Sequence, residues 1–383
     1  MVERSHLQIG MHAGCGGGVD RYFDGLCRAF ERSGVSYRGV VFGRGVADEA
    51  ADLPAGTTIL GSAEAPLHER WQLIRKAVSA SGLQPSKALI ASHFALYGWP
   101  VLSLRHRGVR LVSHFHGPWA DESAAEGASR LAVLAKRLLE RRVYHGSAKV
   151  ISVSEAFRRL AISRYGLRPD RVAAVPAGID AEAIGKRTAG VSRREARERL
   201  GWPPEPDRRI VFCVRRITRR MGLENLIDAV SALAGRHPEL LVMIGGRGAI
   251  LDELRARVAR LGLENHVRLL GFVPDAELPL AYRAADFTVV PSVALEGFGL
   301  VILESWAAGT PVLVTPVGGM PEVVSPFAPE CVLGGSSVAA LVQGIGAVMA
   351  GDLVLPGAAG CEDHVRRAHA WETVARRLLL AYG

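Results

Sequence analysis

The stretch PSVALEGFGLVILE, from Pro291 to Glu304, decides the fold of this chain. It follows an apolar run, Phe287 to Val290, that is typical of a buried strand. Gly297 and Gly299 would let a ligand approach the backbone closely. A helix that begins near Phe298 would direct its free N–H groups and the positive end of its dipole beyond that strand. The stretch therefore predicts a binding site for an anion such as phosphate.

Two carboxylates flank these glycines. Glu296 and Glu304 are separated by seven residues, and Glu304 is expected about two helical turns deeper. From there its carboxylate could reach hydroxyl groups of the same ligand. A phosphate cradle beside two hydroxyl-binding carboxylates suits a sugar nucleotide.

The same stretch resembles a known family. Glu296 and Glu304 match the E-x7-E motif of retaining glycosyltransferases with the GT-B fold, and the surrounding residues resemble glycosyltransferase family 4. The further matches are Ala285-Asp286, Pro291-Ser292, Gly297-Phe298-Gly299, Gly309-Thr310-Pro311-Val312, Gly318-Gly319 and Glu322. The resemblance implies an α/β protein with two Rossmann-like domains, a cleft between them and a C-terminal helix that crosses back to the first domain.

The pattern along the chain agrees with two α/β domains. Short Val-, Ile- and Leu-rich runs alternate with longer amphipathic runs, which is typical of parallel sheets. The predicted strands are residues 7–11, 37–42, 88–92, 110–114, 149–153, 172–175, 209–214, 240–244, 267–270, 287–290, 311–315 and 331–333. A polar, basic and Pro-rich joint near residues 185–207 separates two series of strands. We predict an acceptor-side domain over residues 1–185, a nucleotide-sugar-binding domain over 186–362 and a crossover helix over 363–383.

The residues after the strand at 209–214 resemble the family pattern G-R-L-x-x-x-K-G, whose Arg and Lys hold the donor diphosphate. Arg216 matches the family's Arg, but Met221 stands where the Lys is expected and Arg215 replaces a Gly. Negative charge grows on a diphosphate leaving group, so the site still requires cations. Arg216 can supply a bidentate fork, and we expect Arg219 or Arg220 to supply the second charge. A solvated arginine loop and an impaired donor site remain the alternatives.

The resemblance assigns the remaining roles. Glu296 orients the sugar, Glu304 binds the ribose, and Arg216 with the amides of Phe298 and Gly299 stabilises the leaving diphosphate. The expected donor-binding residues are Gly16, Gly17, Arg220, Gly246, Phe272, Val273, Gly297, Phe298, Gly299, Leu300 and Glu304. Retention in this family is described as front-face attack assisted by the leaving phosphate. We therefore name no enzymic nucleophile and expect no metal ion or other cofactor.

Two motifs of the first half carry the other expected contacts. Residues 14–19, GCGGGV, depart from the dinucleotide fingerprint G-x-G-x-x-G because Val19 stands at its third glycine. They resemble the glycine-rich first loop of GT-B enzymes. Arg44 could still bind a 2′-phosphate, which leaves an NADP-dependent oxidoreductase open. His116 follows the strand at 110–114 and resembles the family His that contacts the donor sugar, whereas alternation along the strand points His114 into the sheet.

Composition and charge limit the partners and the cellular compartments that the sequence supports. The net charge is +9, and residues 1–185 hold 24 Lys and Arg against 17 Asp and Glu. Neither zinc-finger spacing nor an RNP-like motif supports a nucleic-acid partner. The basic amphipathic stretch at 130–142 could contact an anionic membrane, although most such helices pack on their own domain. Five scattered cysteines, and a start without a signal-peptide pattern, favour the cytoplasm or its membrane surface.

These observations predict a cytoplasmic, retaining, metal-independent glycosyltransferase with Glu296, His116 and Arg216 as catalytic residues. It would move a sugar from a nucleoside-diphosphate sugar to a hydroxyl of a glycan, a lipid-linked or a natural-product acceptor. A nucleotide-sugar epimerase of the same fold, the NADP-dependent oxidoreductase and a non-catalytic nucleotide-sugar-binding protein are the alternatives.

Overall fold

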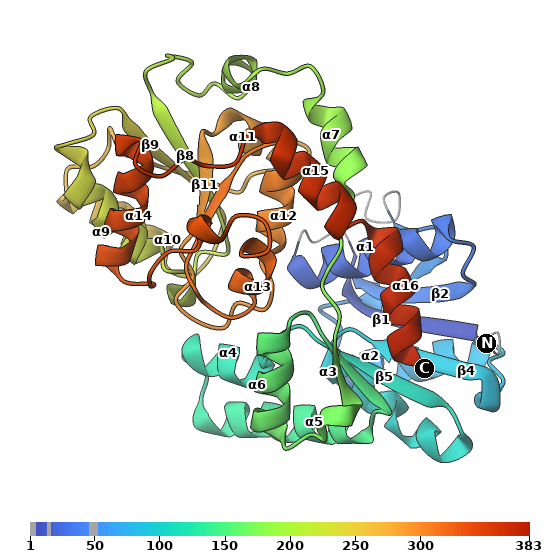
Figure 1. Cartoon of the computed structure of the whole chain (residues 1–383). Helices are drawn as coiled ribbons and strands as arrows, with labels where there is room; N and C mark the ends of the chain where they lie inside the picture. Colours follow the sequence, from blue (N-terminus) through green and yellow to red (C-terminus); the bar gives the residue numbers. More distant parts are fainter. Residues whose placement is uncertain (1–4, 14–16, 46–52) are drawn as a thin grey trace. The chain divides into compact units, whose positions relative to one another are not determined.

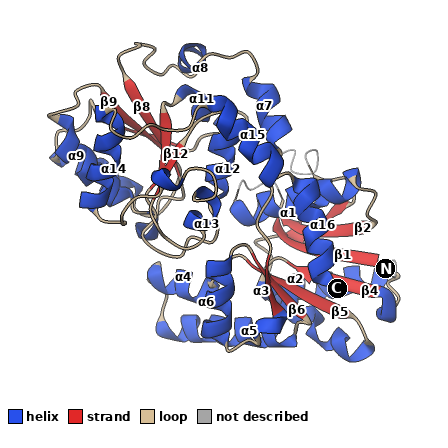
Figure 2. Cartoon of the chain, in the orientation of Figure 1, coloured by secondary structure: helices blue, strands red, loops and turns tan. Residues whose placement is uncertain are grey.

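The computed structural model describes residues 5–13, 17–45 and 53–383. The chain forms two compact units (Figure 1). Unit 1 comprises residues 1–178 and 371–383, and unit 2 comprises residues 179–370. Each unit is a parallel sheet flanked by helices (Figure 2), which confirms the predicted α/β class with two Rossmann-like domains.

Unit 1 contains a seven-stranded parallel sheet with the order β3-β2-β1-β4-β5-β6-β7. Its strands are β1 (Ser5–His12), β2 (Tyr37–Gly43), β3 (Thr57–Ser62), β4 (Ala88–Ser92), β5 (Arg110–Phe115), β6 (Lys149–Ser152) and β7 (Val172–Ala174). Its helices are α1 (Gly18–Arg32), α2 (Leu67–Ala80), η1 (Pro85–Lys87), α3 (Ala95–Gly98), η2 (Trp99–Arg107), α4 (Trp119–Ala125), α5 (Arg130–Gly146), α6 (Glu155–Tyr165), η3 (Pro169–Arg171) and α16 (Trp371–Tyr382).

Unit 2 contains a five-stranded parallel sheet with the order β10-β9-β8-β11-β12. Its strands are β8 (Arg209–Val214), β9 (Leu240–Gly245), β10 (Val267–Gly271), β11 (Phe287–Val290) and β12 (Val312–Val314). Its helices are α7 (Ala181–Thr188), α8 (Arg193–Arg199), η4 (Arg219–Met221), α9 (Leu223–Ala234), α10 (Leu251–Arg260), α11 (Leu278–Ala284), α12 (Leu300–Ala307), α13 (Met320–Val324), η5 (Pro329–Cys331), α14 (Val338–Ala350) and α15 (Ala358–Ala368).

Both sheets are buried on two faces, which explains why their strands are continuous apolar runs. Every residue of β9 and β11 is buried, as expected for parallel strands covered by helices. The order of strands reverses once in each sheet, between β1 and β4 in unit 1 and between β8 and β11 in unit 2. Open α/β sheets bind ligands beyond the carboxyl ends of their strands at this point.

The joint between the two series of strands differs from the sequence interpretation. Residues 181–188 and 193–199 form α7 and α8. Trp202, in the Pro-rich segment, is buried with Phe212 and Tyr282 in the core of unit 2. The many basic residues of this stretch obscure, in the sequence, the apolar positions of its two helices. The units divide at residues 178 and 370, so the boundaries lie away from the 185 and 362 expected from the sequence.

Two strand assignments also require correction. Strand β3 was not predicted, because its sequence, TTILGS, is half-exposed at the edge of the sheet. Residues 331–333, predicted as a strand, make only an isolated bridge from Val332 to Val314 beside the turn η5. In the part of the chain that the structure describes, no helix has the length and apolarity to cross a bilayer.

The last helix, α16, packs on α1 within unit 1. Trp371 at its start is 3% exposed and lies against Gly25 and Gly178, where an added Cβ would come within 2.2 and 2.6 Å of its indole. At the other end of α16, the hydroxyl of Tyr382 lies 2.7 Å from Nε2 of the buried His114. The helix is therefore fixed at both ends on its own unit.

The contact between Gly25 and Trp371 predicts that Gly25→Ala destabilises unit 1. The added methyl group would overlap the indole, and overpacking costs about 1–3 kcal/mol. Gly185→Ala is the matched control, because it also lies in a helix but has open space around the new Cβ, and it should be neutral or slightly stabilising. Urea unfolding and proteolysis of the C-terminal helix would measure both effects. Equal stability of the two variants would contradict the packing described.

Candidate active site

The reversal point of the unit 2 sheet brings two loops together. One loop follows β8 and begins with Arg215, and the other follows β11 and runs from Pro291 to Gly299. Backbone bonds join them, since the amide of Val293 donates to the carbonyl of Arg220 over 2.9 Å. Gly222, at φ 70°, approaches so closely that a Cβ there would lie 2.0 Å from the carbonyl oxygen of Pro291. The two loops therefore form one continuous surface.

An ion pair between Arg215 and Glu296 lies at the centre of this surface. Nη2 of Arg215 donates to the Glu296 carboxylate, to Oγ of Ser292 over 3.0 Å and toward Sδ of Met221 over 3.1 Å. The two charged side chains are only 6% and 12% exposed. Burial by itself would raise the pKa of Glu296, but the charge and hydrogen bond of Arg215 outweigh burial and lower that pKa below its usual value.

The backbone around Glu296 is closely constrained. Leu295, which precedes it, has φ 52°, the one positive φ found for a residue other than glycine within the described ranges. The carbonyl of Glu296 accepts the amide of Gly319 over 3.0 Å, and a Cβ at Gly318 would lie 1.7 Å from that carbonyl oxygen. The surrounding loops therefore determine where the carboxylate of Glu296 points.

Helix α12 begins at Leu300, two residues later than the sequence interpretation placed it. Gly299, at φ 85°, precedes its first turn, and Gly297 and Phe298 lie buried before it. Glu304 therefore lies about one turn into the helix. Its side chain is buried and accepts a 2.7 Å hydrogen bond from the hydroxyl of Tyr282 in α11. That bond fixes the orientation of the carboxylate.

The loops after β9 and β10 complete the same edge of the sheet. Gly246 has φ 142°, and its amide donates to the carbonyl of Gly271 over 2.6 Å. Phe272 is 52% exposed with the guanidinium of Arg247 4.4 Å from the centre of its ring, whereas Val273 is buried. The predicted residues of unit 2 thus follow β8, β9, β10 and β11 at their carboxyl ends.

The arginines after β8 have different environments from one another. Arg216 is exposed. Arg219 is 62% exposed and pairs with Glu224 and Glu253 on the surface, so it does not contribute charge beside Glu296. Arg220 is buried beneath the loop and donates to the carbonyl of Leu295 over 3.1 Å.

The residue that sequence reasoning missed is Arg215. It was treated only as a departure from a family glycine, yet its guanidinium contacts the side chain of Met221, the position of the missing lysine. The signal in the sequence was this pair of departures: a glycine replaced by a cation six residues before a lysine replaced by a neutral side chain.

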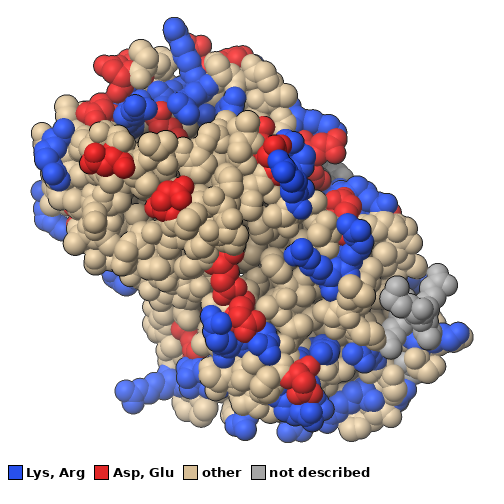
Figure 3. Space-filling view, viewed as in Figure 1, with Lys and Arg blue, Asp and Glu red and all other residues tan. Residues whose placement is uncertain are grey.

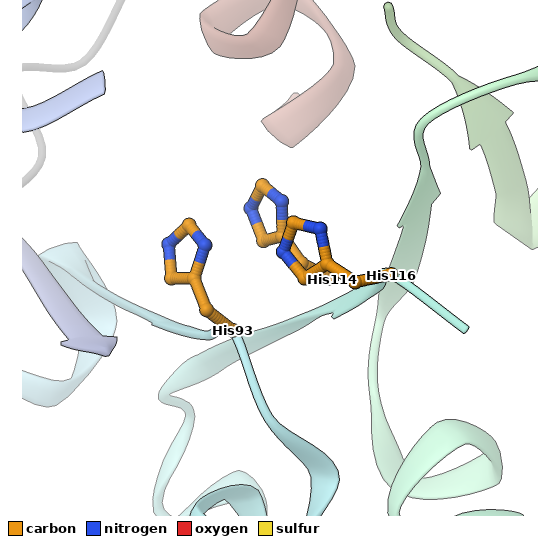
Figure 4. A group of neighbouring side chains, drawn as sticks. All are labelled: His93, His114 and His116. Carbon is orange, nitrogen blue, oxygen red and sulfur yellow. The ribbon is translucent and has the colours of Figure 1, made fainter. Parts of the chain in front are cut away.

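In unit 1 three imidazoles gather beyond β4 and β5 (Figure 4). The ring centres of His93 and His114 are 4.1 Å apart, and His116 lies 5.8 Å from each, with Tyr22 packed against all three. Nε2 of His93 bonds to Oε1 of Gln8 over 3.0 Å. Nε2 of His116 is buried without a hydrogen-bond partner in the structure.

Burial keeps these imidazoles neutral. It lowers the pKa of His93 and His114 well below the usual value, and that of His116 to about 4. Candidate ligand nitrogens of the three lie within 4.8 Å of one another. The rings of His93 and His114 are stacked with only 18° between their planes, so their lone pairs lie in separate, nearly parallel planes. One metal ion cannot lie in the planes of both rings, and this geometry favours packing over coordination.

A buried side chain of α5 fixes the segment that follows His116. Glu140 of α5 is fully buried, and its carboxylate accepts the amides of Trp119 over 2.8 Å and Ala120 over 3.2 Å at the start of α4. Its oxygens accept from amides of the first helical turn, which have no partner within the helix. Helices α4 and α5 thereby fix the chain directly after His116.

The predicted glycine loop of unit 1 is described only in part, because residues 14–16, including Gly16, lie outside the described residues. Gly17 precedes the first turn of α1, where Asp20 accepts the amide of His12 over 3.1 Å. Arg44, the residue an NADP enzyme would need, donates to Nδ1 of His12 over 3.0 Å.

Two family profiles cover most of the chain. Residues 16–183 match the profile described as Glycosyltransferase Family 4, and residues 192–355 match the one described as Glycosyl transferases group 1. The two profiles fall on units 1 and 2 respectively.

Individual relatives agree with these matches. A D-inositol 3-phosphate glycosyltransferase of Actinosynnema mirum is 30% identical over 312 residues, which is 77% of this chain and 72% of that protein. The mannosylfructose-phosphate synthase of Agrobacterium fabrum is 34% identical over 191 residues, 48% of this chain but only 41% of that enzyme. Alignments with the most similar curated relatives thus span less than half of those proteins.

Solved structures show the same fold. HepE of Anabaena, crystallised with UDP and glucose, superimposes with a TM-score of 0.75 at 20% identity, and the alignment covers 98% of both chains. At this identity the likeness concerns the fold alone, and it confirms the GT-B architecture expected from the sequence.

The buried ion pair predicts that Arg215→Met destabilises unit 2 by roughly 3 kcal/mol, because the Glu296 charge would be left buried and unpaired. Adding Glu296→Gln to that variant removes the charge and should restore most of the loss. Arg219→Met is the control and should cost less than about 1 kcal/mol, since its ion pairs are exposed. Urea unfolding of the four proteins gives the comparison. A double variant as unstable as Arg215→Met would refute the pairing.

The lowered pKa of His116 predicts a pH dependence of unit 1. As pH falls, a histidine in the unfolded chain, with a pKa near 6.5, binds a proton before the folded His116 does. The stability that His116 contributes is therefore present above about pH 6.5 and is lost as pH falls toward about 4. Unfolding free energies measured at pH 7.5, 6 and 5 should fall less steeply in His116→Gln. Asp20 and Glu140, whose pKa values are raised by burial, act in the opposite direction in both proteins. Parallel curves would contradict a neutral, buried His116.

Proposed function

The chain belongs to glycosyltransferase family 4, and we propose that it transfers a sugar from a nucleoside-diphosphate sugar to an acceptor hydroxyl with retention of anomeric configuration. The observation that carries the proposal is the Arg215–Glu296 pair at the reversal point of the unit 2 sheet. A family relative of this fold needs a cation for the diphosphate and a carboxylate for the sugar at that point, and this pair provides both.

The cations act on the leaving group. The guanidinium of Arg215 is held by Ser292 and Glu296, and the exposed Arg216 follows it directly. A diphosphate bound beside them would gain charge-assisted hydrogen bonds that strengthen as negative charge grows on its bridging oxygen. The amides before α12, at Phe298 and Gly299, add partial positive charge without a metal ion.

The two carboxylates act on the hydroxyl groups of the donor. Glu296 stays ionised because Arg215 lowers its pKa, so it can accept hydrogen bonds from the sugar and stabilise cationic character at the anomeric carbon. Glu304, oriented by Tyr282, binds the ribose. For His116 of unit 1, whose Nε2 has no hydrogen-bond partner in the structure, the family resemblance supports a contact with a hydroxyl of the transferred sugar.

Two further observations bear on the donor and on the cellular compartment. UDP-sugars are the first donors to test, because the structurally similar HepE was crystallised with UDP. The four described cysteines are free and buried, which suits a reducing compartment such as the cytoplasm. The nucleotide-sugar epimerase stays the alternative within the fold, and it would isomerise the sugar without an acceptor.

The proposal predicts that one class of UDP-, GDP-, ADP- or dTDP-sugar raises the melting temperature of the protein and is turned over. Glu296→Gln should lower the rate by a factor on the order of a hundred or more, because the charge near the anomeric carbon is lost. Glu330→Gln, the same change at an exposed glutamate of η5 outside the family motifs, is the control. Proton NMR of the product should show the donor's anomeric configuration.

Stabilisation by NADP instead of sugar nucleotides would support the oxidoreductase and refute this assignment. Product isomerised without an acceptor would support the epimerase. Donor binding with neither hydrolysis nor transfer would leave only a nucleotide-sugar-binding protein.

A further inference from the structure

Helix α5 of unit 1 carries an exposed row of leucines. Leu131, Leu134 and Leu138 are 80%, 51% and 58% exposed. Their spacing of three and four residues places them on one face of the helix. Exposed apolar side chains usually occur singly, so three in a row mark this face as unusual. We refer to these three residues as the leucine row.

Arginines border the leucine row. Arg141 and Arg142 lie about one turn beyond Leu138, and with Arg105 of η2 they line an open hollow of about 460 Å³ against Leu138. Within residues 5–13, 17–45 and 53–383, no carboxylate pairs with any of these three guanidinium groups. The only acidic residue of α5, Glu140, is buried on the other side.

Two other cations of α5, Lys136 and Arg137, have partners inside the unit. Nζ of Lys136 donates to Oγ of Ser123 over 2.7 Å and lies 4.7 Å from the centre of the Trp119 ring. Arg137 donates to Asp121 over 2.8 Å. These side chains attach α5 to α4. The helix therefore has an inner face that packs on its own unit and an outer face of leucines and arginines.

We propose that this outer face docks unit 1 on an anionic lipid bilayer. The leucine row would enter the boundary between head groups and acyl chains, while the arginines pair with lipid phosphates. A bilayer satisfies both demands, since it offers apolar depth directly beneath negative charge. Lys and Arg side chains gather along the lower edge of Figure 3, where α5 lies in Figure 1.

Other occupants fit this face less well. A second copy packed α5 against α5 could bury the leucines, but α5 would offer the arginines no exposed carboxylate, because Glu140 is buried. A nucleic acid would satisfy the arginines but would leave the leucines in water. The proposal goes beyond the transfer reaction and does not depend on it, because the docking face contains none of the residues assigned to the donor.

The test is sedimentation of the full chain with vesicles of phosphatidylcholine alone and of phosphatidylcholine with phosphatidylglycerol. We expect binding to the anionic vesicles that weakens with salt. Leu131→Gln/Leu134→Gln/Leu138→Gln keeps a good helix former at each position and should bind at least about tenfold more weakly. Arg141→Gln/Arg142→Gln should lose about fivefold for each arginine and most of the salt dependence.

Two matched controls test whether vesicle binding depends on the docking face rather than on exposed leucines or arginines in general. Leu380→Gln removes another leucine of unit 1 that is 72% exposed, and Arg366→Gln/Arg367→Gln removes two exposed arginines of α15. Both should bind like the wild type, and thermal melts should show all variants folded. A wild type that ignores anionic vesicles, or leucine variants that bind equally well, would overturn the proposal. So would a dimer in sedimentation velocity that the leucine substitutions dissociate.

Discussion

The ion pair between Arg215 and Glu296 is the interaction on which the interpretation of unit 2 depends. A buried ion pair contributes little net stability, because desolvation of both charges offsets their attraction. Its position is more informative. The guanidinium comes from the end of β8 and the carboxylate from the loop after β11, the two strands between which the sheet order reverses. Ligands of α/β sheets bind there, so the pair is better explained by ligand chemistry than by stability.

Glycines make the close packing of the loops around this ion pair sterically possible. At 222, 246 and 318 a Cβ would lie 2.0 Å or less from a backbone carbonyl oxygen of a neighbouring loop. The chain therefore packs its loops backbone against backbone, and this leaves the ion pair and the start of α12 at one edge of the sheet. Unit 1 uses the same architecture with different chemistry, since neutral imidazoles and one buried carboxylate hold the loop of His116.

Much of the fold could be predicted from the sequence, because the strands and helices follow from local residue patterns. Strands β4, β8 and β11 were bounded correctly, since each is a continuous apolar run between turn residues. Strand β3 and helices α7 and α8 were missed because half-exposed or basic residues obscure their apolar positions. The placement of Glu296 and His116 after strands was predicted from the sequence, and their roles come from the family resemblance. The Arg215 contact was not predicted, because it joins residues 81 apart and depends on where a long side chain is directed in the folded unit.

We propose that Arg215 provides the cation that the family pattern places at residue 221. Sδ of Met221 lies 3.1 Å from Nη2 of Arg215. A lysine side chain at 221 would place its amine at about the same distance beyond the position of Sδ. The most direct measurement is the affinity for UDP, or for whichever nucleoside diphosphate stabilises the protein, in Arg215→Gly, Met221→Lys and the double variant. The account predicts that Arg215→Gly weakens binding at least about tenfold, as loss of one charged hydrogen bond would, and that Met221→Lys restores it in the double variant. A double variant that binds no better than Arg215→Gly alone would contradict the account.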